Sequence, residues 1–131
     1  PIVKAFDEGT RHAEPWVDAH TIASGIRVPV AVGDFLILDA VRESNGFAVA
    51  VSDESIFEAH QECARKEGIL LCPEGAATLA ALKQELASGR IKADEQVMLF
   101  NCATGLKYPM PSTHHKIDLG KPIDYDFIRD C

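Results

Sequence analysis

The stretch FAVAVSDESIFEAHQECARKEGILLCPEGAATLAALKQELASG, residues 47–89, alternates short apolar runs with two long amphipathic patterns. The runs at 47–51 and 69–71 are short, apolar and partly β-branched, as buried strands are. Each run is followed by a segment with helical spacing, at 52–68 and 73–89. The alternation of strand and helix predicts right-handed βαβ crossovers and therefore a parallel sheet.

Both predicted helices carry clear signals at their ends. Ser52 or Asp53 can cap the first helix, and Gly68 can end it. Pro73 opens the second helix, and Gly89 lies just past its end. In the first helix, one face that we expect to be buried contains Ile56, His60, Cys63 and Ala64.

The flanking segments extend the same pattern. Residues 96–100 (QVMLF) read as a further strand, and residues 1–9 read as a short helix. Residues 10–30 lack a period and predict a long loop, whereas 33–46 predict a helix that Asp34 can cap. The fold class that follows is α/β, with a parallel sheet of βαβ units covered by helices.

Composition limits the classes of function. The chain has 131 residues, enough for one domain, and a net charge of −7, which disfavours binding to nucleic acid or to an anionic membrane. No apolar run approaches the ~20 residues of a membrane helix. The four cysteines lack C-x-x-C spacing, so we expect reduced thiols in a cytoplasmic protein and no metal site. Because the chain starts at Pro1, we expect it to be a piece of something longer.

Small polar side chains follow the predicted strands. Cys102 and Thr104 come just after the run 96–100, and Glu74 comes just after 69–71. Ligands of open parallel sheets lie beyond the carboxyl ends of the strands. Glycines beside these residues would let a ligand approach the backbone closely. The sequence therefore predicts a ligand site at this edge.

The motifs CPEGAATLAAL (72–82) and FNCATGLKYP (100–109) resemble those of threonine synthase. The stretch TIASGIRVPVAVGDFLILDAVRESNG (21–46), followed by AVAVSDESI (48–56), strengthens the resemblance. Threonine synthases are pyridoxal-phosphate enzymes of the fold shared with tryptophan synthase β, cysteine synthase and threonine dehydratase. The resemblance covers about residues 1–109, in consistent order, and implies part of the large domain of a fold-type-II pyridoxal-phosphate enzyme. Residues 110–131 match no motif and are expected to form an irregular tail.

The resemblance implies how the loop after 96–100 contacts the cofactor. A Ser, Thr or Cys ahead of a G-L-K faces the nitrogen of the pyridine ring in this family. By position that residue is Cys102, with Thr104 as the fallback. A thiol is a weak hydrogen-bond donor, so it would orient the ring more than charge it.

The resemblance also implies further pocket residues. An A-S-G loop passes beside the cofactor in this family, which places Ala23, Ser24 and Gly25 near the ring. Glu74 occupies a family position that lines the pocket. Arg27 could hold a substrate phosphate through its bidentate donors.

Two parts of a complete enzyme are missing. The family's Schiff-base lysine sits in a motif such as S-F-K-D, and its glycine-rich loop holds the cofactor phosphate. The chain has no S-F-K-D string and no two adjacent glycines. The resemblance is thus to the C-terminal part of an enzyme that converts O-phosphohomoserine and water to threonine and phosphate. We expect the isolated chain to be inactive, with no catalytic residue of its own, and to bind its missing N-terminal half or self-associate.

Simpler interpretations remain open for each residue. Cys102 could be a small buried residue, and Thr104 could bond within its own turn. Glu74 could only stabilise a helix N-terminus. Plain loop or surface positions are the simpler interpretation for Ser24, Gly25, Arg27 and Lys107. The set His114, His115 and Asp118 has poor spacing for a metal, and His60 fits a core or boundary histidine.

Alternatives for the whole chain also remain. Another β-family pyridoxal-phosphate enzyme, such as threonine dehydratase, would share the fold, although the loops ASGIRVP (23–29) and NCATGLKYP (101–109) favour threonine synthase. A non-catalytic α/β interaction domain that has lost the chemistry is the alternative from a different class. An upstream lysine motif and glycine-rich loop in frame would exclude that alternative.

Overall fold

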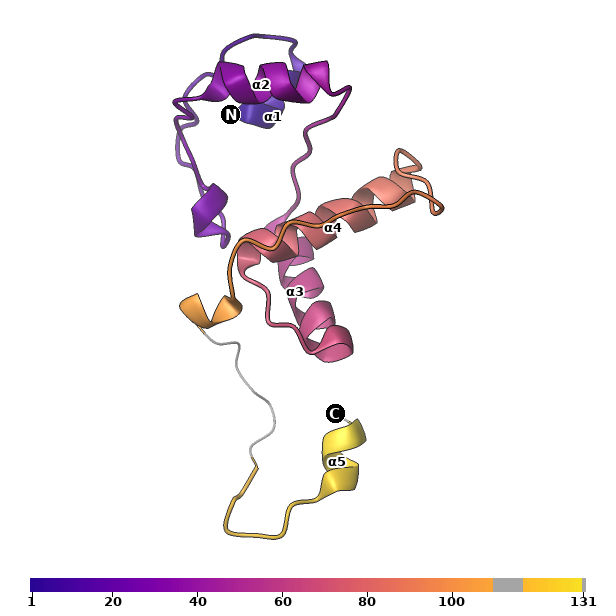
Figure 1. Cartoon of the computed structure of the whole chain (residues 1–131). Helices are drawn as coiled ribbons and strands as arrows, with labels where there is room; N and C mark the ends of the chain where they lie inside the picture. The colour runs from indigo at the N-terminus through magenta and orange to yellow at the C-terminus, as the bar shows by residue number, and fades with distance from the viewer. Residues whose placement is uncertain (110–116, 131) are drawn as a thin grey trace.

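The computed structural model describes residues 1–109 and 117–130, in which helices are joined by extended segments (Figure 1). The elements in chain order are α1 (Ile2–Asp7), the 3-10 helix η1 (Ser24–Ile26), α2 (Asp34–Glu43), α3 (Asp53–Glu67), α4 (Pro73–Ser88), the 3-10 helix η2 (Gly105–Lys107) and α5 (Tyr125–Asp130). The helices expected at 1–9, 33–46, 52–68 and 73–89 are thus confirmed.

Helices α3 and α4 are capped at both ends. The Ser52 hydroxyl accepts a hydrogen bond from the Ser55 amide at 3.1 Å. The Cys72 thiol accepts one from the Gly75 amide at 3.3 Å. Gly68 (φ 67°) and Gly89 (φ 76°) end the two helices in the left-handed conformation that glycine adopts without strain. These bonds satisfy donors at the helix ends that would otherwise lack partners.

The packing of α3 against α4 forms the core. Small side chains on α4 allow close approach, and the buried set comprises Ala23, Ile56, Ala59, Cys63, Leu71, Ala76, Ala77 and Ala80. His60 and Ala64, expected on the buried face of α3, are only half-buried, and Ala59 is buried in addition. At the rim, Glu62 forms an ion pair with Lys66 on the same helix at 2.8 Å and with Lys83 on α4 at 2.5 Å, and the second pair joins the two helices.

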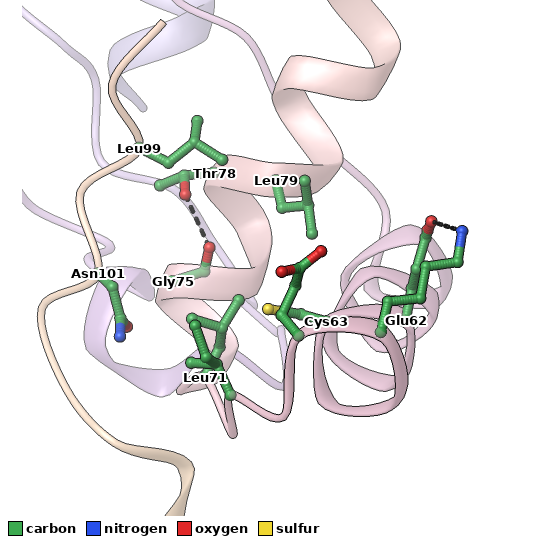
Figure 2. Close-up of a pocket in the computed structure, with 11 residues that line it drawn as sticks. Glu62, Cys63, Leu71, Gly75, Thr78, Leu79, Leu99 and Asn101 are labelled. Atoms are coloured by element: carbon green, nitrogen blue, oxygen red, sulfur yellow. Dashed lines mark hydrogen bonds and ion pairs between the residues drawn. The ribbon is translucent and has the colours of Figure 1, made fainter. Parts of the chain in front are cut away.

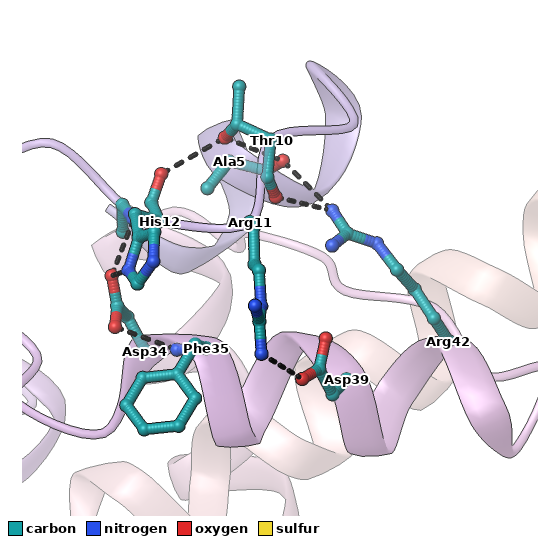
Figure 3. A network of polar contacts seen from close by, with 9 residues as sticks. Ala5, Thr10, Arg11, His12, Asp34, Phe35, Asp39 and Arg42 are labelled. Atoms are coloured by element: carbon teal, nitrogen blue, oxygen red, sulfur yellow. Dashed lines mark hydrogen bonds and ion pairs between the residues drawn. The ribbon is translucent and has the colours of Figure 1, made fainter.

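Helices α1 and α2 form a second packed pair, held by polar contacts (Figure 3). Arg42 on α2 donates to the carbonyl oxygens of Ala5 (3.3 Å) and Thr10 (2.7 Å). Asp34 begins α2, but Gly33 occupies the cap position that we expected Asp34 to fill. The Asp34 carboxylate instead accepts from the amide of Ala13 at 2.7 Å, because it is buried beneath that loop.

The described residues contain no β-strand, so the parallel sheet expected from 47–51, 69–71 and 96–100 is not present in them. Their one β-bridge is isolated and antiparallel, between Leu71 and Thr104. A helix satisfies its hydrogen bonds within itself, whereas a strand needs a neighbour to pair with. Among the described residues, these apolar segments lie outside the helices but form no strand, so their prediction as strands is not confirmed.

These segments leave apolar side chains in solvent. Within 96–100, Met98 is 94% exposed and Phe100 is 75% exposed. No helix in the described part of the chain combines the length and the hydrophobicity needed to cross a membrane. The region expected as an irregular tail contains α5, whose first turn is capped by Asp124 through the Asp126 amide at 3.1 Å.

Candidate functional site

The loop after residue 100 lies against the start of α4. The Gly105 amide donates to the Leu70 carbonyl at 2.9 Å, and the Cys72 amide donates to the Ala103 carbonyl at 3.3 Å. These two bonds frame the Leu71–Thr104 bridge. The two segments that the sequence placed at one ligand edge are therefore adjacent, although the pairing is antiparallel.

Two glycines allow this close approach. A Cβ on Gly105 would lie 2.5 Å from the carbonyl oxygen of Leu71, which is backbone and cannot rotate away. A Cβ on Gly75 would lie 2.5 Å from the side-chain oxygen of Asn101. Figure 2 shows Asn101 on the extended segment beside the first turn of α4. A side chain at Gly105 would push the loop away from the helix, whereas a side chain at Gly75 would require the Asn101 side chain to rotate away.

Glu74 ties a third segment to this site. Its Oε1 atom accepts from the Gly25 amide at 2.5 Å and from the Tyr108 hydroxyl at 2.7 Å. The residue is only 8% exposed. A Cβ on Gly25 would lie 2.7 Å from Oε1, so glycine is required for this contact. Glu74 thus links η1, α4 and the segment after η2.

The electrostatics of Glu74 follow from these bonds. Burial raises its pKa and is the largest single influence. The hydrogen bonds from the Tyr108 hydroxyl and from backbone amides, including that of Gly25, favour the ionised form and together outweigh burial, so the pKa lies below its ordinary value of 4.5. Donation to Glu74 raises the pKa of Tyr108. At neutral pH the site therefore holds a carboxylate and a neutral phenol.

Cys102 presents a thiol at the surface of this cluster. The residue is exposed, and its Sγ atom lies 3.7 Å from the Sγ atom of buried Cys72. Thr104 is also exposed, but its Oγ1 atom accepts from the Leu106 amide at 3.3 Å and caps η2. The Thr104 hydroxyl thus makes a hydrogen bond within its own loop, whereas the Cys102 thiol contacts a residue at the start of α4.

Five of the six predicted site residues meet in this region, namely Ser24, Gly25, Glu74, Cys102 and Thr104. Ser24 begins η1, which packs against α4. Arg27 does not join them: it lines a separate hollow of about 570 Å³ together with Pro1, Lys4 and Trp16. The Arg27 side chain is exposed, which agrees with the simpler interpretation of this residue as a surface arginine.

Two residues of the site were missed by sequence reasoning. Tyr108 stands within the motif 100–109, but a phenol in a loop gives no local signal of a partner 34 residues away. Cys72 directly precedes Pro73, the first residue of α4, and this cap position was a signal that could have identified it. The adjacency of its thiol to Cys102 depends on tertiary contacts.

Of the candidate metal ligands, only Asp118 lies among the described residues. His114 and His115 lie outside the described residues, and Asp118 is paired with Lys121 at 3.6 Å. In the described ranges, no three His, Cys, Asp or Glu side chains come together to hold a metal ion. Lys107 lies in η2 and is exposed.

Two hollows flank the loop cluster. One, of about 340 Å³, lies between α3, α4 and the extended segment that carries Leu99 and Asn101 (Figure 2). The other, of about 370 Å³, is largely apolar and is lined by Ile22, Ile56, Phe57, His60, Pro73, Gly105, Tyr108 and Pro109. Gly75 and Asn101 line the first hollow, and Gly105 and Tyr108 line the second, so residues of the site contribute to both.

Comparison with known proteins gives a consistent result. A family model described as "Pyridoxal-phosphate dependent enzyme" matches residues 1–103. The chain is 41% identical over 109 residues to a threonine synthase from Methanocaldococcus jannaschii and 38% identical over 109 residues to one from Methanosarcina acetivorans. Each alignment covers 83% of the chain and 27% of the relative. A threonine synthase from Halalkalibacterium halodurans is 37% identical over 92 residues, 70% of the chain and 26% of the relative. The resemblance seen in the motifs is confirmed, and the chain spans about a quarter of the length of these relatives.

Proposed function

Because the chain belongs to the family of pyridoxal-phosphate-dependent enzymes, we propose that it forms one wall of the cofactor site of a threonine synthase-like lyase. The complete enzyme would convert O-phosphohomoserine and water to threonine and phosphate. The chain would correspond to a C-terminal region in which residues 1–109 belong to one incomplete α/β domain. The reducing cytoplasm is the compartment that suits its free cysteines.

The convergence of three segments at the start of α4 carries this proposal. Gly25, Glu74 and the loop after residue 100 are far apart in the sequence, yet hydrogen bonds hold them together. They are also the segments whose motifs resemble threonine synthase. A surface assembled in this way from loops and a helix N-terminus is typical of a ligand site.

The groups present fit one edge of a pyridine ring. The exposed Cys102 thiol is a neutral partner for the ring nitrogen, and Thr104 offers a hydroxyl two residues later. Gly25 has no side chain, and the space that a Cβ would fill is occupied by the Glu74 carboxylate, so the Gly25 loop can lie directly against α4. No buried side-chain oxygen or nitrogen among the described residues lacks a hydrogen-bond partner.

Pyridoxal phosphate supplies the electron sink for breaking bonds at an amino acid, and the protein orients it. In the proposed site, Glu74 holds the Gly25 loop and Tyr108 together through one hydrogen bond to each. Cys102 would lie toward the ring nitrogen and would leave it largely uncharged, because a thiol is only a weak donor. The chain has neither an S-F-K-D motif nor adjacent glycines, so it offers no family lysine and no phosphate loop. We therefore expect the chain alone to release no phosphate from O-phosphohomoserine.

The remaining walls must come from another polypeptide segment. The exposed apolar side chains of Met98 and Phe100 lie on a segment with free backbone edges, which is a surface for strand pairing. We propose that the rest of the enzyme covers this segment and that the isolated chain self-associates in its absence. A strictly monomeric chain at high concentration in sedimentation would contradict this part of the proposal.

A chimera tests the function directly. The aligned 109 residues of the Methanocaldococcus jannaschii threonine synthase are replaced by those of this chain, and threonine and phosphate release from O-phosphohomoserine are measured. We expect both products in equal amounts. The parental enzyme and the isolated 131-residue chain serve as the two reference reactions.

The outcomes separate the parts of the proposal. A folded chimera that fails to bind pyridoxal phosphate would contradict the assignment of the wall. A chimera that binds the cofactor but instead deaminates threonine would assign the chain to a dehydratase. The substitution Cys102→Ala is expected to weaken cofactor binding, whereas Cys63→Ala, in the core of α3, serves as the matched thiol control.

A further inference from the structure

We propose that Cys72 and Cys102 form a redox-sensitive thiol pair that a low-molecular-weight disulfide, such as oxidised glutathione, converts to an intramolecular disulfide. Their Sγ atoms are 3.7 Å apart, in van der Waals contact. The two residues come from segments 30 positions apart in the sequence, so tertiary structure brings them together. The pair is distinct from Cys63, which lies in the core between α3 and α4.

The backbone around the pair is already fixed. The Cys72 amide donates to the carbonyl of Ala103, the residue next to Cys102, and the Leu71–Thr104 bridge lies beside it. Cys72 is also anchored as the cap of α4, where its Sγ atom accepts from the Gly75 amide. Because these bonds hold the backbone on both sides, we expect the disulfide to form mainly through rotation of the exposed Cys102 side chain.

The two thiols differ in accessibility, which sets the order of the reaction. Cys102 is exposed, so its thiolate can attack the disulfide of oxidised glutathione and release one glutathione. Burial raises the pKa of Cys72, so this thiol reacts poorly with reagents in solution. Its sulfur then attacks the Cys102 sulfur and releases the second glutathione. Two thiols and one glutathione disulfide yield one protein disulfide and two glutathione thiols, which carry the two protons.

The bond would change the ligand-facing loop. It would consume the Cys102 thiol and tie residue 102 to the cap of α4. Loss of the partner of the pyridine nitrogen is a consequence that rests on the proposed function, whereas formation of the disulfide does not. A cytoplasmic disulfide of this kind is transient and is reversed by reduced glutathione.

Peptide mapping tests the pair on the unmodified chain. The chain is incubated with oxidised glutathione, alkylated and digested with trypsin, which places Cys63, Cys72 and Cys102 in the separate peptides 43–65, 67–83 and 93–107. We expect 67–83 and 93–107 to be linked in a species whose chain mass is lower by two hydrogen atoms. Reduced glutathione is expected to restore both thiols.

Three controls make the result decisive. Cys72→Ser is expected to stop the reaction at a glutathione adduct on Cys102, and the chain in denaturant is expected to lose the preference for this pair. Cys63→Ser is expected to leave the link intact. A native chain that keeps glutathione on Cys102 with Cys72 free, or that links Cys102 to other chains, would overturn the proposal. Neither result depends on whether the chain binds pyridoxal phosphate.

Discussion

The α3–α4 pair and the segments 47–51 and 96–100 all contain apolar side chains, yet these side chains differ in burial in the structure. The helices bury Ile56, Ala59 and Ala76 almost completely. In 96–100, Met98 and Phe100 remain largely exposed. The helices satisfy their hydrogen bonds internally and need only each other for a core, whereas an extended segment needs a neighbouring strand.

This difference shows which parts of the chain are self-sufficient. The capped helices fix the position of Glu74 and Cys72 at the start of α4. That helix end then holds the loop of residues 101–108 through the Leu71–Thr104 bridge. The candidate site thus depends on the self-sufficient part, and we propose that the exposed extended segments contact the rest of a larger enzyme.

Among the predicted changes, truncation of a core side chain should lower the free energy of unfolding the most. Ile56→Ala is expected to lower the free energy of unfolding by about 2–5 kcal/mol, because it leaves a cavity between α3 and α4. Met98→Ala in the same chain is expected to change it by less than about 0.5 kcal/mol, because the side chain is in solvent. Denaturant unfolding followed by circular dichroism measures both. Equal losses would contradict the division into packed and unpartnered regions.

A side chain at Gly105 should disturb the junction of the two regions. Gly105→Ala places a Cβ against the Leu71 carbonyl and is expected to cost about 1–3 kcal/mol of stability. The exposed neighbour Leu106 provides the control, since Leu106→Ala removes only a solvent-facing side chain. Amide exchange at Gly105 and Cys72 should quicken in the glycine variant. Unchanged exchange would show that the bridge does not hold the loop.

Glu74 should make the junction sensitive to acid. Because its pKa is lower in the folded chain than the ordinary 4.5, its contribution is complete above the unfolded value and is lost as pH falls through the folded value. Glu74→Gln is expected to cost about 1 kcal/mol at pH 7 after allowance for solvent screening, and to flatten this acid dependence. The exposed Glu58→Gln is the control. A steep acid dependence that persists in Glu74→Gln would assign the effect to other groups.

The ion pairs at the rim of α3 and α4 should contribute least to the stability of the folded chain. Hydrogen bonds from Lys66 and Lys83 hold the pKa of Glu62 at about 2. Lys83→Met is expected to raise this pKa and to change stability only slightly, because the pair is exposed and screened by salt. Carboxyl NMR titration measures the shift. An unchanged midpoint would show that Lys83 does not contact Glu62 in solution.

Local sequence signals predicted the helices but not the pairing of the extended segments. Ser52, Gly68 and Gly89 act within one turn, so their roles could be inferred directly. The motifs that contain Glu74 and Cys102 led to the prediction of a ligand edge, and in the structure these two motifs lie next to each other. The bond from Tyr108 to Glu74 joins residues 34 positions apart, and strand partners are equally non-local, so neither leaves a local pattern.

The ring nitrogen of bound pyridoxal phosphate gives the most direct test that Cys102 faces the cofactor. The nitrogen-15 chemical shift of ring-labelled cofactor is measured in the chimera with Cys102, with Cys102→Asp and with Thr104→Asp. The account predicts an unprotonated nitrogen with Cys102 and a protonated one with Cys102→Asp only, because an adjacent carboxylate stabilises the positive charge. An unchanged shift in Cys102→Asp, or protonation in Thr104→Asp alone, would contradict it.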